Sequence, residues 1–148
     1  MTTERLALYD IDSVSATVMN IPITDGRGQE VFLEITPPEQ FEYIEGNGLV
    51  VACATRKRLY PVKLTLVSSS RHTAQLSALH AMDYLSVGGA GVGAFLVKDA
   101  GSTSLTGDSC RIVQAPARTF GRLIKEETWL LMVTSSPSKM LFGGHEIV

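Results

Sequence analysis

Residues 60–99 read YPVKLTLVSSSRHTAQLSALHAMDYLSVGGAGVGAFLVKD, and this stretch decides the fold. Apolar residues at 62, 64 and 66 alternate with polar ones, which is the period of a strand with one buried face. Three serines follow at 68–70, and serine favours helix N-caps because its hydroxyl accepts a hydrogen bond from an unpaired first-turn N–H. Leucine or methionine at every third position from 76 then predicts a helix over about 71–85. Glycines end this helix and a strand pattern resumes at 95–97, so one helix must pack against a structure made of strands.

Turn residues divide the rest of the chain into short strand patterns. Asp25-Gly26-Arg27-Gly28 reads as a hairpin turn, since glycine supplies the positive φ that tight turns require. Strands at intervals of about 8–12 residues favour a sandwich or barrel over a parallel βαβ array. The length of 148 residues is typical of one domain, so we predict a mainly β single domain, an antiparallel β-sandwich or half-open barrel with one flanking α-helix. Besides the strands at 60–67 and 95–97, the predicted strands are 13–21, 29–36, the two arms of a hairpin at 40–55, 108–114, 126–134 and a short piece at 140–142.

The predicted hairpin at 40–55 carries aromatic side chains that a lone subunit would struggle to hide. Phe41 and Tyr43 alternate with polar and aliphatic residues along its first arm, and the turn Glu45-Gly46-Asn47-Gly48 leads to Leu49 on its second arm. Contiguous exposed apolar side chains mark interaction surfaces. A basic run, Arg56-Lys57-Arg58, follows the hairpin. It is either a solvated loop or strand edge, or one side of a subunit contact with an acidic patch.

Composition and charge argue against several classes of function. The net charge is −2 and the pI about 5.9, without the clustered basic face that nucleic-acid binding usually needs. Cys53 and Cys110 fall in predicted strands and are interpreted as buried thiols rather than a disulfide. No Cys/His cluster is spaced for a metal site, so no metal or other cofactor is predicted. The N-terminus lacks a signal-peptide pattern and no apolar run approaches ~20 residues, so we expect a soluble protein made in a cytoplasm.

No residue pattern points to catalysis. The glycines at 89–93 follow a helix and open a strand, whereas a phosphate-binding loop follows a strand and opens a helix. His72 and His80 lack a metal motif and are interpreted as helix-surface residues. The serines at 68–70 lack the turn of a nucleophile elbow. We therefore expect a protein that is not an enzyme and has no catalytic residues.

The order of these parts is similar to that of the tail tube proteins of bacterial viruses, and it most resembles the small tube proteins of contractile-tailed phages. The resemblance covers residues 7–144, although the glycine-rich 87–93 and the basic run 56–58 depart from the family pattern. The matching pieces are a Leu-Tyr-Asp segment at 8–10, the acidic and aromatic stretch at 41–48, the strand 62–66, a Ser-rich helix start and helix at 76–84, Phe-Leu-Val-Lys-Asp at 95–99, Phe-Gly at 120–121, Glu-x-x-Trp at 126–129 and Phe-Gly-Gly at 142–144.

This resemblance implies a self-assembling virion structural protein. Subunits of that family form hexameric rings whose sheets close into one inner barrel, and stacked rings make the hollow conduit for DNA ejection. The helix packs on the outer side of the sheet, and the long hairpin bridges to the neighbouring ring. The implied partners are further copies of the chain, sheath, tape-measure and baseplate or terminator proteins, and genomic DNA that passes without specific binding. The implied location is the virion tail, with the host cytoplasm during assembly.

Two sets of residues follow as expected sites. Unpaired strand edges and exposed hairpins become contact surfaces in an oligomer. Glu30 and Glu34, predicted on one face of the strand 29–36, are expected to face the lumen, because DNA slides best past a wall that does not attract its phosphates. The expected contacts between subunits or rings are Phe41, Tyr43, Glu45, Asn47, Leu49, Arg56, Lys57 and Arg58.

Two other functions remain open at this stage. One is the tube subunit of a related contractile injection system, which shares the architecture. The other, from a different class, is a small β-barrel module that binds a ligand. A tube protein should polymerise as its concentration rises, whereas a binding module should remain a discrete species with a defined pocket. The sequence also leaves open whether the subunit repeats along a tube or initiates one at the baseplate.

Overall fold

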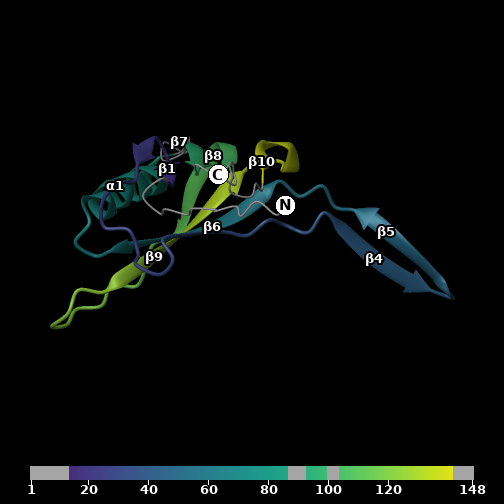
Figure 1. Cartoon of the computed structure of the whole chain (residues 1–148), viewed down its shortest axis with the longest axis horizontal. Coiled ribbons are helices and arrows are strands. Elements are labelled where there is room, and N and C mark those ends of the chain that lie inside the picture. The colour runs from purple at the N-terminus through teal and green to yellow at the C-terminus, as the bar shows by residue number, and fades with distance from the viewer. Residues whose placement is uncertain (1–13, 87–92, 100–103, 142–148) are drawn as a thin grey trace, which may run out of the picture.

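The computed structural model describes residues 14–86, 93–99 and 104–141, which form antiparallel strands and one helix (Figure 1). The predicted segments at 8–10 and 142–144, His145 and most of the glycine-rich 87–93 lie outside the described residues. The elements are β1 (Ser15–Val18), β2 (Ile21–Pro22), β3 (Leu33–Ile35), β4 (Phe41–Gly46), β5 (Leu49–Ala54), β6 (Leu59–Val67), α1 (Arg71–Leu85), β7 (Gly93–Lys98), β8 (Ser104–Gln114), β9 (Glu126–Thr134), the 3₁₀ turn η2 (Pro137–Lys139) and β10 (Met140–Leu141).

Within the described residues, eight strands form one sheet and two more form a separate hairpin. The main sheet runs in the order β2-β1-β7-β8-β9-β6-β3, with β10 pairing to β8, and its strand pairs are antiparallel. The sheet path ends at β2 and β3, so it does not close into a barrel. The predicted class, mainly β and antiparallel with one helix, is confirmed.

The core lies on one face of the main sheet. Along β6 and β9 every second residue is buried, and the register sets Val62 opposite Leu131 and Leu64 opposite Trp129. These buried pairs reproduce the alternation expected from the sequence, because successive strand residues point to opposite faces. From α1, Leu76 is fully buried in the same apolar cluster. The helix thus contributes Leu76 to the core on this face of the sheet, with Leu79 partly buried against it.

The strand predicted at 13–21 is divided in two. Ala16 and Val18 of β1 are buried together, as their alternation predicts. After β1 the chain reverses at Met19 and Asn20, both with positive φ (51° and 68°), and β2 pairs back onto β1. Two successive residues with positive φ are typical of the tightest hairpin turns. Because neither residue is a glycine, no glycine turn signal marks this reversal in the sequence.

The hairpin turn predicted at 25–28 is wrong. β1 and β3 do not pair, because they lie in different parts of the sheet, with β7, β8, β9 and β6 between them. The turn instead packs beside the end of β6, where the Val67 N–H donates to the Gly26 carbonyl and the Gly28 N–H donates to the Thr65 carbonyl. The following strand is also shorter than predicted, since β3 covers only Leu33–Ile35.

The remaining elements agree closely with prediction. The helix occupies Arg71–Leu85 with Ser70 as its N-cap, and β9 occupies Glu126–Thr134. β8 buries Cys110 and Ile112, as expected, but begins earlier, at Ser104. Two long segments therefore lie outside the main sheet and its core. They are the hairpin β4–β5 and the connection 115–125 between β8 and β9.

Candidate assembly interface

The hairpin β4–β5 projects from the main sheet at one end of the molecule's long axis (Figure 1). Among the strands that the structure describes, these two pair only with each other, through a register that runs from Phe41 opposite Ala54 to Gly46 opposite Leu49. The turn residues Asn47 and Gly48 both have positive φ (51° and 81°), as a two-residue hairpin turn requires. All twelve strand residues are exposed. The predicted hairpin at 40–55 is therefore confirmed, as is the exposure of its large apolar side chains.

Both faces of this hairpin are apolar. Directly paired residues of an antiparallel ladder share a face, and successive residues alternate between faces. The first face carries Phe41, Tyr43, Glu45, Val50, Ala52 and Ala54, and the second carries Glu42, Ile44, Gly46, Leu49, Val51 and Cys53. Tyr43 is 74% exposed and Leu49 is 65% exposed. Because neither face is polar, burying one of them against a partner would still leave the other in water.

The base of the hairpin joins the main sheet through a short polar segment. The Thr55 N–H donates to the Gln40 carbonyl at 2.8 Å and the Thr55 hydroxyl donates to the Glu39 carbonyl at 2.7 Å. The basic run 56–58 follows and is exposed, with Arg56 at a positive φ of 50°. These three cations thus lie where the hairpin leaves the sheet.

Glu30 and Glu34 do not share a strand face, because β3 begins only at Leu33. Glu30 is exposed in the segment before β3. Glu34 pairs across strands with Lys63, while its neighbours Leu33 and Ile35 pair with the buried Leu64 and Val62. Glu34 and Lys63 therefore lie on the sheet face that points away from the core.

The connection 115–125 is a second projecting segment, at the opposite end of the long axis from the hairpin (Figure 1). The sequence shows Arg118 and Arg122 in a connection marked by the turn residues Pro116 and Gly121, but it does not predict how far the side chains stand from the core. Phe120, Leu123 and Ile124 are 87%, 79% and 67% exposed. Sequence reasoning missed this segment because it has no strand or helix period. The available signal was three large apolar residues within a stretch rich in turn residues and cations.

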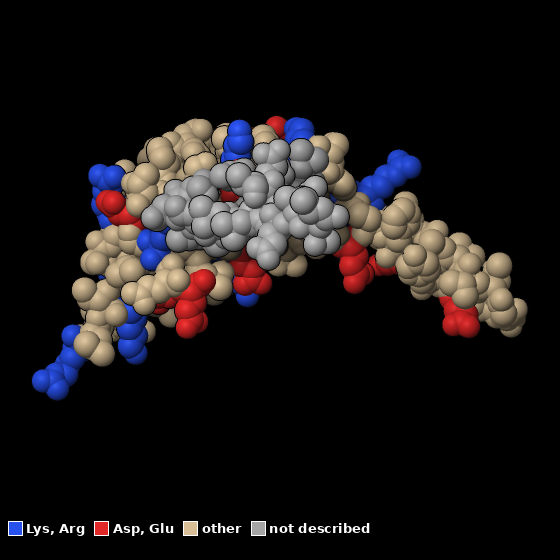
Figure 2. Space-filling view, in the orientation of Figure 1, with Lys and Arg blue, Asp and Glu red and all other residues tan. Residues whose placement is uncertain are grey.

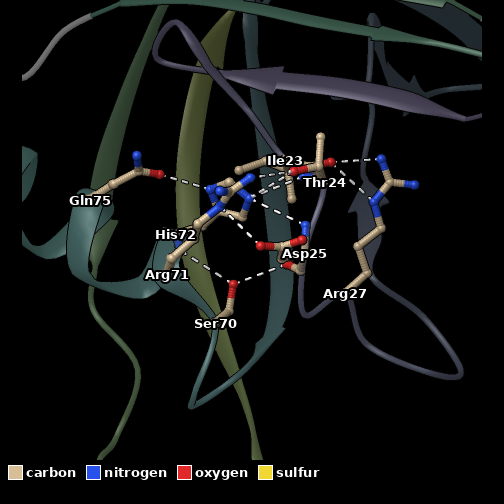
Figure 3. Close-up of polar contacts among 8 residues, drawn as sticks. All are labelled: Ile23, Thr24, Asp25, Arg27, Ser70, Arg71, His72 and Gln75. Carbon is tan, nitrogen blue, oxygen red and sulfur yellow. Dashed lines mark hydrogen bonds and ion pairs between the residues drawn. The ribbon is translucent and has the colours of Figure 1, made fainter.

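A polar cluster joins the 23–27 turn to the start of α1 (Figure 3). The Nε2 atom of His72 accepts hydrogen bonds from the Thr24 and Asp25 N–H groups at 3.1 and 3.3 Å. Since Nε2 accepts, the proton lies on Nδ1, which donates to the Gln75 Oε1 at 2.8 Å. His72 is buried, so its interpretation as a helix-surface residue is wrong.

The same cluster explains why the helix begins at Arg71. The Ser70 hydroxyl accepts from the His72 N–H and donates to the Asp25 carbonyl at 3.0 Å. The Arg71 guanidinium pairs with the Asp25 carboxylate at 2.9 Å. Gly26 has a φ of +65°, and a Cβ added there would lie 2.5 Å from the Ser70 Cβ. His72 and its neighbours therefore satisfy one another, which makes this cluster a structural clamp between turn and helix.

The two cysteines lie in contrasting environments. Cys110 is buried in the core, and this burial raises the pKa of its thiol to about 12. Cys53 is exposed on the second face of the hairpin, so its predicted burial is wrong for the single chain. Both are free thiols, as predicted. Within the ranges that the structure describes, no group of three or more His, Cys, Asp or Glu residues is placed to hold a metal ion.

Comparison with known proteins does not assign the chain to a family. No protein-family model matches the chain, and no curated protein matches it. Among the described residues, none of the helices has the length and apolar character needed to cross a membrane. The two projecting segments thus stand as the candidate functional surfaces on structural grounds.

Proposed function

We propose that this chain is a structural subunit of a phage tail tube that assembles with copies of itself, and that it is not an enzyme. The observation that carries the proposal is the β4–β5 hairpin, which is apolar and exposed on both faces. An isolated two-stranded hairpin is at best marginally stable in water. Its faces need partners, and identical subunits stacked in rings supply them repeatedly. The proposed contact residues are Phe41, Tyr43, Glu45, Asn47 and Leu49 of the hairpin and Arg56, Lys57 and Arg58 at its base.

The open main sheet supports the same proposal. A sheet that ends in two edges can be extended by the edges of neighbouring copies, and closed rotational symmetry then removes all free edges. A ring of six such sheets would enclose a channel. The chain would act in the virion tail and assemble in the host cytoplasm, with sheath, tape-measure and baseplate or terminator proteins as its other partners.

The sheet face that points away from the core is the proposed channel wall. Glu34 lies there beside Lys63, so opposite charges are adjacent across β3 and β6. A wall of this kind presents little net attraction to DNA phosphates, which favours passage over binding. Glu30 is a second proposed lumen residue. Reversal of both glutamates to lysine should leave assembly intact and slow DNA ejection at low salt; unchanged ejection at every salt concentration would remove the lumen assignment.

The tube of a related contractile injection system would use the same hairpin and sheet. The phage tail and the injection system differ in the molecule that passes through the channel. Identifying that molecule would distinguish the two functions. The ligand-binding alternative is less favoured, because the groove lined by Thr24, Arg71, His72 and Gln75 has its histidine fully engaged by hydrogen bonds within the chain.

Negative-stain electron microscopy across a concentration series tests the proposal. We expect six-fold rings or hollow tubes from the purified chain. Deletion of residues 45–48 should give folded subunits, with an unchanged circular dichroism melting profile of the main sheet, that do not polymerise. Normal tubes from the deletion variant would contradict the role of the hairpin, and a discrete monomer that binds a small ligand would favour the binding module.

A further inference from the structure

The two projecting segments differ in charge as well as in position. In the space-filling view, acidic side chains lie on the hairpin arm at one end and basic side chains lie at the tip of the opposite end (Figure 2). The hairpin strands contain Glu42 and Glu45 and no cation. The connection 115–125, sequence APARTFGRLIK, contains three cations and no carboxylate.

The two hairpin carboxylates lie on different faces. Glu45 shares the first face with Phe41 and Tyr43, and Glu42 shares the second with Ile44 and Leu49. Each face thus presents one negative charge beside large apolar side chains. In the part of the chain that the structure describes, neither carboxylate has a hydrogen-bond or ion-pair partner. Both are available to a cation from outside the chain.

The connection 115–125 has the opposite composition. Phe120, Leu123 and Ile124 are all highly exposed. The Arg118 guanidinium lies 3.5 Å from the Glu127 carboxylate, which is itself buried, so this cation is partly neutralised within the chain. Arg122 and Lys125 are exposed, and within the described ranges their side chains have no ion-pair partner. Two free cations therefore flank an exposed apolar cluster.

We propose that the β4–β5 hairpin of one copy docks on the connection 115–125 of a second copy, with Glu42 and Glu45 facing Arg122 and Lys125. Contact between the apolar side chains of the two segments buries both sets, which are exposed in a single copy. The opposite charges make the hairpin bind the connection 115–125 in preference to another hairpin. The proposal rests on the proposed function, for which it names the surface that receives the hairpin. Because the two segments lie at opposite ends of the molecule's long axis, the contact is head-to-tail and repeats from copy to copy.

A charge-exchange experiment tests this pairing directly. One variant carries Glu42→Lys with Glu45→Lys, and the other carries Arg122→Glu with Lys125→Glu. Alone, each variant places like charges in the contact, which should raise the concentration needed for assembly by about a hundredfold or more. In an equimolar mixture each hairpin can find a loop of opposite charge, so assembly should return to near the wild-type concentration. Sedimentation velocity measures association, and electron microscopy reports the shape of the product.

Matched controls separate this contact from general charge effects. Glu30→Lys with Glu34→Lys repeats the charge change of the hairpin variant, and Lys63→Glu with Lys98→Glu repeats that of the loop variant. All eight positions are exposed, so every variant should fold. The two control variants place like charges opposite each other at positions 34 and 63, so a small drop in melting temperature is expected for these two alone. Raising the salt concentration should partly restore assembly of each contact variant alone, because salt screens exposed charges.

The possible results separate the proposed contact between the hairpin and the connection 115–125 from the proposal that the chain forms a tube. If wild-type tubes form and both contact variants assemble as wild type does, the hairpin docks elsewhere and this inference is overturned while the tube proposal stands. If each variant fails alone and the mixture also fails, the pairing is again wrong. If the mixture associates head-to-tail without rings or tubes, the pairing stands and the tube proposal fails. If neither wild type nor mixture associates at any concentration, both are overturned.

Discussion

The β6–β9 pair and the β4–β5 pair are both antiparallel ladders, yet they are stabilised in opposite ways. In β6 and β9, buried apolar residues alternate with more exposed ones, and the buried set packs into the core with Leu76 of the helix. In β4 and β5 every residue is exposed and both faces are apolar. The first pair buries one face in the core of its own chain, whereas both faces of the second pair are exposed. The exposed hairpin faces are therefore the surfaces for which we propose partners from other copies.

Equal truncations in the two ladders should have very different effects on stability. Leu131 is fully buried in β9, and Leu131→Ala should lower the free energy of unfolding by about 2–5 kcal/mol, the usual cost of a cavity left by a large aliphatic side chain. Leu49 is exposed in β5, and Leu49→Ala should change it by no more than about 0.5 kcal/mol. Urea unfolding of dilute, unassembled protein measures both.

The two variants, Leu131→Ala and Leu49→Ala, should rank in the opposite order when assembly is measured instead of stability. Leu49→Ala should raise the concentration at which particles form, although its subunit is stable. A large loss of stability on Leu49→Ala in dilute protein would mean that the hairpin packs within its own chain, as β6 and β9 do.

A smaller effect is expected at the clamp that connects the turn 23–27 to the helix. Ser70→Ala removes the cap that accepts from the His72 N–H and the bond to the Asp25 carbonyl, and should cost about 1 kcal/mol or slightly more. Ser69 is exposed and provides a matched control, since Ser69→Ala should be nearly neutral. Equal melting temperatures for the two variants would show that the Ser70 contacts do not stabilise the folded chain.

The smallest expected effect is a dependence on pH at the surface of β8. Lys139 donates to the Asp108 carboxylate at 2.7 Å, and this bond together with its positive charge lowers the pKa of Asp108 below its ordinary value of 3.8. The stabilisation is present above pH 3.8 and is lost as the pH falls through the lower, folded-state value. Asp108→Asn should therefore narrow the difference between melting temperatures at neutral and acidic pH by a small amount. An unchanged pH dependence would show that this exposed pair contributes nothing measurable.

The sequence predicted the parts of the fold whose periodicity is set by one buried face. The strand Glu126–Thr134 and the helix Arg71–Leu85 were predicted with their observed bounds, because alternation, a serine cap and the spacing of leucines act locally. The turn at 25–28 was misassigned because two glycines suit many turns, and its partners are the helix start and the end of β6. Burial of His72 likewise depends on backbone groups 47 and 48 residues away.

Of the two candidate surfaces, the hairpin could be predicted from the sequence and the connection 115–125 could not. The hairpin and its exposure followed from residues 40–55, since apolar residues on both arms around a tight turn leave few ways to hide them. The connection 115–125 did not follow, because its significance depends on lying at the far end of the molecule with side chains of opposite charge. Charge complementarity between distant segments becomes visible only when both are placed in space.

Alkylation of Cys53 across a concentration series measures directly whether the hairpin becomes buried when copies assemble. This thiol lies on the second face of the hairpin and is exposed in the single chain, whereas Cys110 is buried, with its pKa raised to about 12, and serves as an internal control. We expect Cys53 to react rapidly in dilute protein and to become protected as particles form, while Cys110 reacts only after unfolding. Rapid reaction of Cys53 at every concentration, including in assembled particles, would contradict the claim that the hairpin is buried between copies.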